Sequence, residues 1–240
     1  IICSIFIGIN VEKLRGSDWC VDLSEYRNNG LEIDNSKVSL GIDVRGGRIS
    51  LGVVSSEGQV LCSRQFPLIV TSSMDFVDGL LTNIGEFLDM IGSRWCLKVA
   101  GLGIGGWVDW ENGVWLYTKR IQSFKDPIPL AALIQKRTGL KVIMDNDIHV
   151  SSLAEMKYGV GKSFSNFLYY HIGTGIAVGI VSNGQLVRGT ANYSGECGQS
   201  LFDMDGTGNL VRLEKFASGA GMVSLARSIL KDYPDSVLLK

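Results

Sequence analysis

A pair of polar residues in the middle of this 240-residue chain has the chemistry of a catalytic or ligand-binding site. Asn146-Asp147 stands where a predicted strand ends and a predicted helix begins, which is where α/β folds place their ligands. Asp147 could act as a general base that takes a proton from a hydroxyl group. The alternative is that Asp145 or Asp147 only caps the following helix, and for an isolated Asn-Asp pair the cap is the commoner role.

Two glutamates further along the chain could hold a ligand that is rich in hydroxyl groups. Glu196 follows the stretch 192–195, and Glu214 follows an apolar stretch at the start of a predicted helix. An ionised carboxylate accepts several hydrogen bonds, which suits sugar hydroxyl groups. The alternative for Glu214 is a first-turn residue that the helix dipole stabilises.

A glycine turn between two predicted strands could bind phosphate. In Gly173-Thr174-Gly175, the missing side chains would let backbone N–H groups approach an anion, and the Thr174 hydroxyl could donate a hydrogen bond. Short glycine motifs are more often plain hairpin turns, so this alternative stays open.

The histidines and tryptophans near these motifs have commoner structural roles. His149 and His171 are the only two histidines, and no cluster of cysteines or carboxylates stands at metal-ligand spacing from them. Trp107, Trp110 and Trp115 follow a glycine-rich strand. They could stack on a sugar ring, but hydrophobic packing or a lobe interface is the commoner use of such residues.

The predicted elements place these residues in an α/β fold. Period-two alternation predicts strands, and apolar residues at helical spacing predict helices. The strands are 38–43, 48–54, 59–64, 95–104, 141–144, 167–171 and 176–181; the helices are 74–91, 128–138, 148–158 and 213–231, and a turn spans 108–113. Residues 1–10 predict a buried strand or helix, and residues 11–37 predict a connector. Two related α/β lobes with a cleft between them suit this order.

Composition limits the classes of function. Hydrophobic residues make up 45% of the chain and charged residues 20%, which is typical of a globular protein with its own core. The net charge of −1, with both signs mixed along the chain, argues against nucleic-acid binding. Five scattered cysteines without a C-x-x-C pair favour a reducing cytoplasm over disulfides or zinc. No apolar run reaches the roughly 18 residues that span a membrane.

Taken together and in order, the motifs resemble the ROK family of repressors, open reading frames and sugar kinases, from about Val38 to Gly221. The resemblance rests on V-A-G-L-G-I-G-G-W at 99–107, D-N-D-I-H at 145–149, H-I-G-T-G at 171–175, G-E-C-G-Q at 195–199, and Leu213-Glu214 followed by Ala217-Ser218. It implies an actin-like, ribonuclease H-like ATPase fold with lobes at 38–147 and 148–240, after an N-terminal extension or linker remnant at 1–37. The family's last helices would follow Lys240, so we expect a fragment with an incomplete second lobe.

The resemblance also implies roles for site residues. The sugar hydroxyl groups would be held by Asn146, Asp147, Glu196, Gln199 and Glu214, with Asp147 as the base in a kinase. The phosphates of ATP would be held by Asp43, Gly46, Gly173, Thr174 and Gly175.

Departures from the family pattern bear on function. Arg45 stands where a glycine lets the triphosphate approach, and the threonine hydroxyl of the family's motif is lost, which argues against ATP binding. Gln199 stands where the family has a histidine that touches both sugar and zinc. Residues 203–209 replace the family's cysteine-rich zinc loop, so no zinc is expected.

These observations predict a sugar-binding, effector-sensing domain of a transcriptional regulator of carbohydrate metabolism, with enzymatic activity the less favoured outcome. Its partner would be a small-molecule sugar, and it would form a homodimer in the cytoplasm, without DNA binding by this chain alone and without membrane contact. The alternative is a glucokinase-like sugar kinase that uses ATP and Mg²⁺ to phosphorylate a hexose or an N-acetyl hexosamine. A third alternative is a gene remnant that does not fold.

Overall fold

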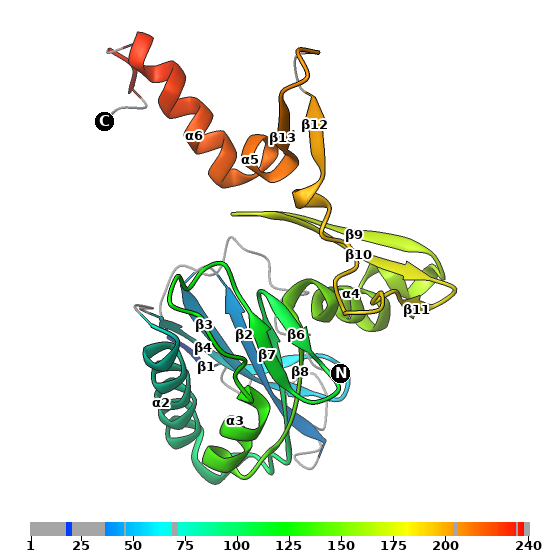
Figure 1. The fold of residues 1–240 in the computed structure, drawn as a ribbon. Helices are drawn as coiled ribbons and strands as arrows, with labels where there is room; N and C mark the ends of the chain where they lie inside the picture. The colour runs from blue at the N-terminus through cyan, green and yellow to red at the C-terminus, as the bar shows by residue number, and fades with distance from the viewer. Residues whose placement is uncertain are drawn as a thin grey trace.

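The computed structural model describes residues 18–20, 37–45, 47–68, 72–203, 206–233 and 235–237. The strand or helix predicted for residues 1–10 therefore lies outside the described residues. The described elements form a six-stranded sheet with helices on both faces and a smaller, three-stranded sheet beside it (Figure 1). A hairpin and a helix extend beyond the smaller sheet (Figure 1). No helix in these ranges has the length and apolar character needed to cross a membrane.

The larger sheet comes from the first part of the chain. Its strands, in spatial order, are β1 (Asp18–Cys20), β4 (Val60–Pro67), β3 (Arg48–Ser55), β2 (Val38–Arg45), β5 (Val99–Ile104) and β8 (Lys141–Asn146). β5 runs parallel to β2, and β8 runs parallel to β5. The register pairs Val44 with Ile104 and Ile104 with Asn146, so the carboxyl ends of these three strands meet at one edge. This edge therefore brings together the residues that follow each strand.

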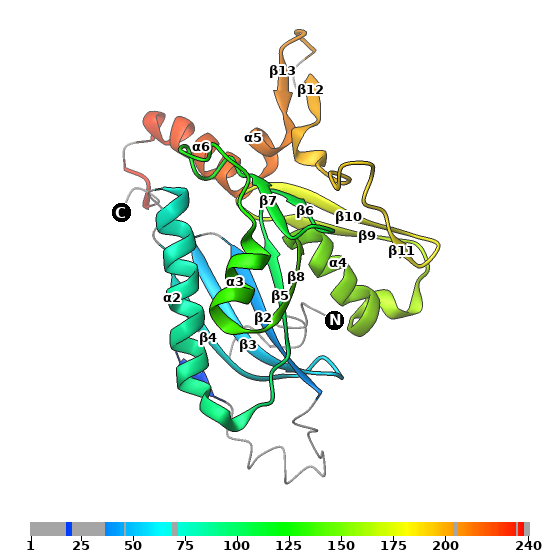
Figure 2. The ribbon, with the colours of Figure 1, turned by 60° about the horizontal axis from the view of Figure 1, so that its bottom comes forward.

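Helices cover both faces of the larger sheet. α2 (Ser73–Ile91) and α3 (Leu130–Thr138) lie on one face, and α4 (Asp147–Tyr158) lies on the other (Figure 2). The face of α2 that was predicted from its periodicity is buried and includes Phe76, Leu80, Ile84 and Phe87. Burying one such side chain contributes roughly 1.5–3 kcal/mol. Gly139 follows α3 in the left-handed conformation, with φ 72°, and ends the helix.

The smaller sheet packs on α4. Its antiparallel strands lie in the order β11 (Gln185–Leu186), β10 (Ile176–Ser182) and β9 (Phe167–Ile172), and a short 3-10 turn, η4 (Val160–Ser163), connects α4 to β9. Gly179 allows the close approach, because a Cβ added there would lie 1.7 Å from the Ser152 hydroxyl oxygen of α4. The strands predicted at 167–171 and 176–181, and the glycine turn between them, are confirmed.

Several predicted elements differ from the structure. The predicted strand 95–104 begins only at Val99, after the 3-10 turn η3 (Gly92–Arg94). The predicted turn 108–113 is flanked by two short strands, β6 (Trp107–Asp109) and β7 (Val114–Tyr117), which form a hairpin. β1 lies within the stretch predicted as a connector, where it pairs with β4.

The single helix predicted at 213–231 is wrong at Ser218. α5 (Leu213–Ala217) ends there, α6 (Gly219–Ile229) begins, and a 3-10 turn, η6 (Leu230–Asp232), follows. Ser218 is extended, with φ −80° and ψ 164°, and its hydroxyl accepts a hydrogen bond from the Gly221 N–H at 3.0 Å. The serine side chain therefore caps a new helix instead of continuing the old one. The elements before α5 are the 3-10 turn η5 (Cys197–Gln199) and the hairpin of β12 (Leu201–Asp203) and β13 (Leu210–Arg212).

Candidate functional site

Asn146 caps α4 at the edge where β8 ends. Its side-chain oxygen accepts hydrogen bonds from the N–H groups of Ile148 at 2.9 Å and His149 at 3.4 Å. Its side-chain nitrogen donates to the Gly106 carbonyl at 3.0 Å, which ties the end of β5 to the end of β8. The capping residue is thus Asn146, so the alternative that an aspartate of this motif is the cap is wrong.

Asp147 is the first residue of α4 and is 8% exposed. One carboxylate oxygen lies 3.8 Å from the Arg45 Nε. The same oxygen would lie 3.6 Å from a Cβ added to Gly105, which is an ordinary van der Waals distance, so the carboxylate lies directly against the backbone that follows β5.

Arg45 joins the end of β2 to the first turn of α4. Its Nε donates to an Asp43 carboxylate oxygen at 2.9 Å, and its Nη2 donates to the Asp147 carbonyl at 3.1 Å and to the Ser151 hydroxyl at 2.6 Å. Asp43 is only 5% exposed. Burial raises the pKa of Asp43 to about 6, Arg45 opposes this rise, and the nearby negative charge of Asp147 adds to it. Gly46, the next predicted phosphate residue, lies outside the described residues.

Glu214 and Gln199 meet from α5 and η5. The Gln199 side-chain nitrogen donates to a Glu214 carboxylate oxygen at 2.9 Å, and the Lys119 ammonium lies 2.5 Å from the same oxygen. Burial acts to raise the pKa of Glu214, but the hydrogen bonds from Lys119 and Gln199 outweigh it and lower the pKa. Gly175 and Gly198 each pass within 3.2 Å of the other Glu214 oxygen, measured from an added Cβ. Glu214 is therefore held ionised and fixed in orientation.

Glu196 lies close enough to the other two acids for their charges to act on its carboxyl group. The residue as a whole is exposed, but protein atoms crowd its carboxyl end, and this loss of water raises its pKa. Lys119 opposes the rise, whereas the charges of Asp147 and Glu214 add to it. The interaction between two charges weakens as the distance between them grows. The acids predicted to bind sugar thus gather in one neighbourhood from α4, η5 and α5.

The predicted phosphate turn lies beside these acids. Gly173-Thr174-Gly175 connects β9 to β10 as a tight turn, closed by a hydrogen bond from the Gly173 N–H to the Gly175 carbonyl at 2.9 Å. The Gly219 N–H at the start of α6 donates to the Gly173 carbonyl at 2.8 Å. The backbone is that of a hairpin turn, and its phosphate role stays a prediction.

A cavity of about 310 Å³ lies on the first-lobe side of Asp147. Arg45, Gly105 and Arg120 line it close to that carboxylate, and most of its remaining wall is apolar, with Leu68, Phe76, Trp115 and Ile121. Cavities of this size hold small molecules. In the described ranges, no group of three His, Cys, Asp or Glu side chains could hold a metal ion.

Sequence reasoning missed several residues of this neighbourhood. Lys119 belongs to no motif, yet its ammonium group forms an ion pair with Glu214. Asp145 was considered only as a cap, but it is buried, and its carboxylate lies 3.4 Å from the His149 Nδ1. His171, expected to be structural, is half-buried and lies close enough to Arg45, Asp147 and Arg120 for their charges to act on it; burial is the main cause of its lowered pKa.

The family model described as "ROK family" matches residues 39–239. The glucokinase of Halalkalibacterium halodurans is 30% identical over 209 residues, which cover 83% of this chain and 62% of that protein. The xylose repressor of Bacillus spizizenii is 30% identical over 169 residues, which cover 70% of this chain and 43% of that protein. The chain thus spans less than two thirds of the length of these relatives.

Solved structures give the same fold. A ROK family transcriptional regulator, described as a homolog of the E. coli MLC protein, matches with a TM-score of 0.74 and 24% identity over 88% of this chain and 56% of its own. A ROK family glucokinase from Streptomyces griseus, in complex with glucose and AMPPNP, matches with a TM-score of 0.69 and 25% identity over 82% of this chain and 62% of its own. The predicted α/β fold of the actin-like ATPase type is confirmed by these likenesses.

Proposed function

Because this chain belongs to the ROK family, we propose that it binds a small-molecule sugar between its lobes, as the effector-sensing part of a transcriptional regulator of carbohydrate metabolism. Its relatives include both sugar kinases and xylose repressors. The division into lobes at 38–147 and 148–240, the homodimer and the cytoplasmic location belong to the same proposal, as does the absence of DNA binding by this chain alone.

The chemistry of the gathered side chains supports a sugar as the ligand. Asp147, Glu196 and Glu214 offer carboxylate oxygens, which accept hydrogen bonds from hydroxyl groups. Gln199 and Asn146 offer amide groups, which both donate and accept. A sugar presents many hydroxyl groups in a fixed ring, so such a mixed set of acceptors and donors suits it.

The position of Arg45 is the observation that favours a sugar sensor over a sugar kinase. Its guanidinium lies between Asp43 and the first turn of α4, where it binds one Asp43 carboxylate oxygen at 2.9 Å and the Asp147 carbonyl at 3.1 Å, and its charge lies 3.8 Å from one Asp147 carboxylate oxygen. Mg²⁺ prefers several free oxygen ligands in octahedral geometry. An aspartate paired with an arginine, with its pKa raised to about 6, does not fit that requirement. The end of β2 is therefore less suited to a nucleotide-bound metal than to a site without one.

A sugar kinase remains the second candidate, because the Gly173-Thr174-Gly175 turn lies within reach of Glu214 and the relatives named glucokinase align with 82% or more of this chain. In that case Asp147 would take the proton from the sugar hydroxyl group that is phosphorylated. Its substrate would be a hexose or an N-acetyl hexosamine.

A thermal-shift screen separates the two candidates. A panel of hexoses and N-acetyl hexosamines is added with and without MgATP, and ADP release is followed in parallel. Stabilisation by one sugar without MgATP, lost in Asp147→Asn and kept in Asp89→Asn on the exposed side of α2, is the expected result. ADP release that requires both Asp147 and a sugar would show that the protein is a sugar kinase and not only a sensor. If no sugar raises the melting temperature, the proposed ligand class is wrong.

A further inference from the structure

The segment before Glu196 crosses from the smaller sheet to the larger one. We call residues 187–195 the strap; they connect β11 to η5. Arg188 forms an ion pair with one oxygen of Asp145 and donates to the Asn192 side-chain oxygen at 3.1 Å. Asn192 donates to the other Asp145 oxygen at 2.9 Å and to the Val108 carbonyl at 3.0 Å. Asp145, Arg188 and Asn192 thus form a closed triangle, which we call the latch.

Two of the three latch residues, Asp145 and Asn192, are buried, so the bonds between them are costly to lose. Asp145 is 5% exposed and Asn192 is 9% exposed. Burial acts to raise the pKa of Asp145, but hydrogen bonds from His149, Asn192 and Arg188 outweigh it, and the net effect is a lowered pKa. Asp145 therefore stays ionised at neutral pH. A buried polar group that loses its partner carries the full cost of its desolvation.

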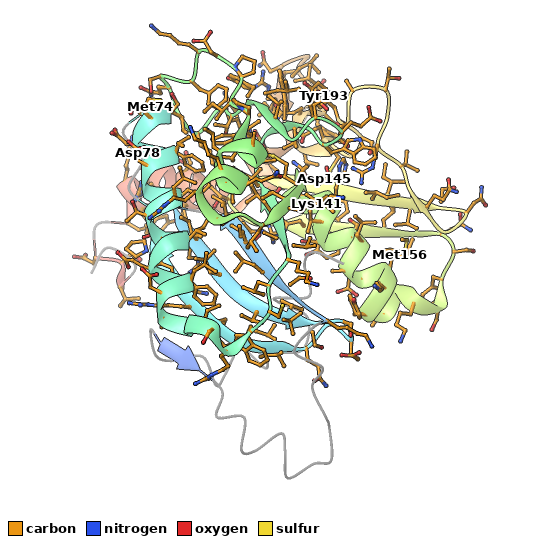
Figure 3. All side chains as sticks on the ribbon, turned by 90° about the horizontal axis from the view of Figure 1, so that it is seen from below. Met74, Asp78, Lys141, Asp145, Met156 and Tyr193 are labelled. Carbon is orange, nitrogen blue, oxygen red and sulfur yellow. The ribbon has the colours of Figure 1, made fainter. Side chains whose placement is uncertain are left out.

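Aromatic contacts also join the strap to the first lobe. The Arg188 guanidinium lies 4.2 Å from the centre of the Trp110 ring, and the rings of Tyr193 and Trp107 are 4.8 Å apart. Both tryptophans belong to the β6–β7 hairpin of the first lobe. Asp145 and Tyr193 lie on the same side of the molecule (Figure 3). For these two tryptophans, the contacts are those of an interface between lobes.

The far end of the strap is fixed to the second lobe. The Gly195 carbonyl accepts a hydrogen bond from the Val178 N–H of β10 at 2.8 Å. Gly195 has φ 83°, and a Cβ added there would lie 1.6 Å from the Val178 carbonyl oxygen, so only glycine fits. Tyr193 and Ser194 alone separate this anchor from Asn192. Glu196, the next residue, is therefore placed by both lobes at once.

We propose that Asp145, Arg188 and Asn192 are positioning residues, which fix the position of Glu196 relative to Asp147 and so set the affinity of the protein for its sugar. The geometry supports this because Asp145 and Asp147 belong to one tripeptide at the end of β8: the first binds the strap and the second faces the ligand. The inference rests on the proposed sugar site. It adds that residues which touch no sugar determine how tightly the sugar is held.

Calorimetric titration of the full chain with the sugar found in the screen tests the latch. Arg188→Ala should weaken sugar binding about tenfold, because a hydrogen bond from the sugar to the charged Glu196 is lost when that carboxylate shifts. Arg227→Ala removes an exposed arginine of α6 and is the matched control, with unchanged affinity. A merely structural role would lower the melting temperature of Arg188→Ala but leave the affinity of the folded protein unchanged.

Two further variants keep the test decisive. Asn192→Gly preserves the left-handed backbone, φ 60°, while it removes the bonds to Asp145 and Val108, and it serves if Arg188→Ala does not fold. Glu196→Gln, combined with Arg188→Ala, should bind no more weakly than Glu196→Gln alone, because both changes remove the same interaction. Additive losses, or wild-type affinity in Arg188→Ala and Asn192→Gly, would overturn the latch and leave the sugar site standing. A wild-type chain that binds no sugar would overturn both.

Discussion

Replacing Asp43 by asparagine should change how the stability of the protein depends on pH. Asp43 is buried at the end of β2, and its pKa is raised from 3.8 to about 6, chiefly by burial, although Arg45 stands beside it. Because the folded-state pKa is above the unfolded value, the native state binds this proton more tightly than the unfolded chain does. The contribution is fully present below about pH 4 and is lost as the pH rises through 6. The rise in pKa corresponds to about 3 kcal/mol.

Asparagine mimics the protonated form and keeps an oxygen that can accept the Arg45 hydrogen bond. We therefore expect the free energy of unfolding of Asp43→Asn, relative to the wild type, to grow by about 2.5 kcal/mol between pH 4 and pH 7.5, because at pH 4 the wild type already lacks part of the full contribution. Urea unfolding at half-unit pH steps measures this difference, and subtracting the wild-type curve cancels the common titrations of other groups. Asp89→Asn, on the exposed side of α2, controls for the loss of a carboxylate. A difference that stays flat, or that falls as pH rises, would refute the reasoning, since the ion pair with Arg45 would then outweigh burial.

Further predictions concern other residues of the candidate site and of the strap. Arg45→Gly removes the guanidinium beside Asp43, so MgATP should bind at least about tenfold more tightly in calorimetry; unchanged affinity would show that Arg45 is not the obstacle. Gly195→Ala should lower the free energy of unfolding by more than about 2 kcal/mol in urea, because its Cβ would collide with the Val178 carbonyl. Sugar affinity should fall on mild acidification, since the raised pKa of Glu196 means that this carboxyl takes up its proton early. In Glu196→Gln that part of the pH dependence should vanish.

The regular elements of the fold were predictable because their side chains repeat with a clear period. The apolar stripe of α2 and the short strands at 167–171 and 176–181 needed no tertiary information. The break at Ser218 was missed because apolar residues continue at helical spacing on both sides, and only the serine cap signals a new start. The β6–β7 hairpin was missed because strands of three and four residues are too short to show alternation.

In the site, the order of motifs was predictable and the pairing of side chains was not. Arg45 stood out as a departure from the family's phosphate loop, but its partners Asp147 and Ser151 lie about a hundred residues further along the chain. Lys119 and Arg188 belong to no motif at all. Their roles arise only when the second lobe folds against the ends of β5 and β8, since pairs so far apart in sequence leave no local pattern.

The tripeptide at the end of β8 shows why a motif predicts a place better than a role. Asp145, Asn146 and Asp147 are all short polar residues, and each could cap a helix, bind a ligand or pair with a cation. The change from strand to helix turns their side chains in three directions: Asp145 toward Arg188 and Asn192, Asn146 back onto the first amides of α4, and Asp147 toward Gly105 and Arg45. Because one backbone turn fixes all three directions together, loosening the strap at Asp145 shifts the carboxylate of Asp147 relative to Glu196. The affinity for the sugar and the contact between the lobes then depend on the same conformational equilibrium.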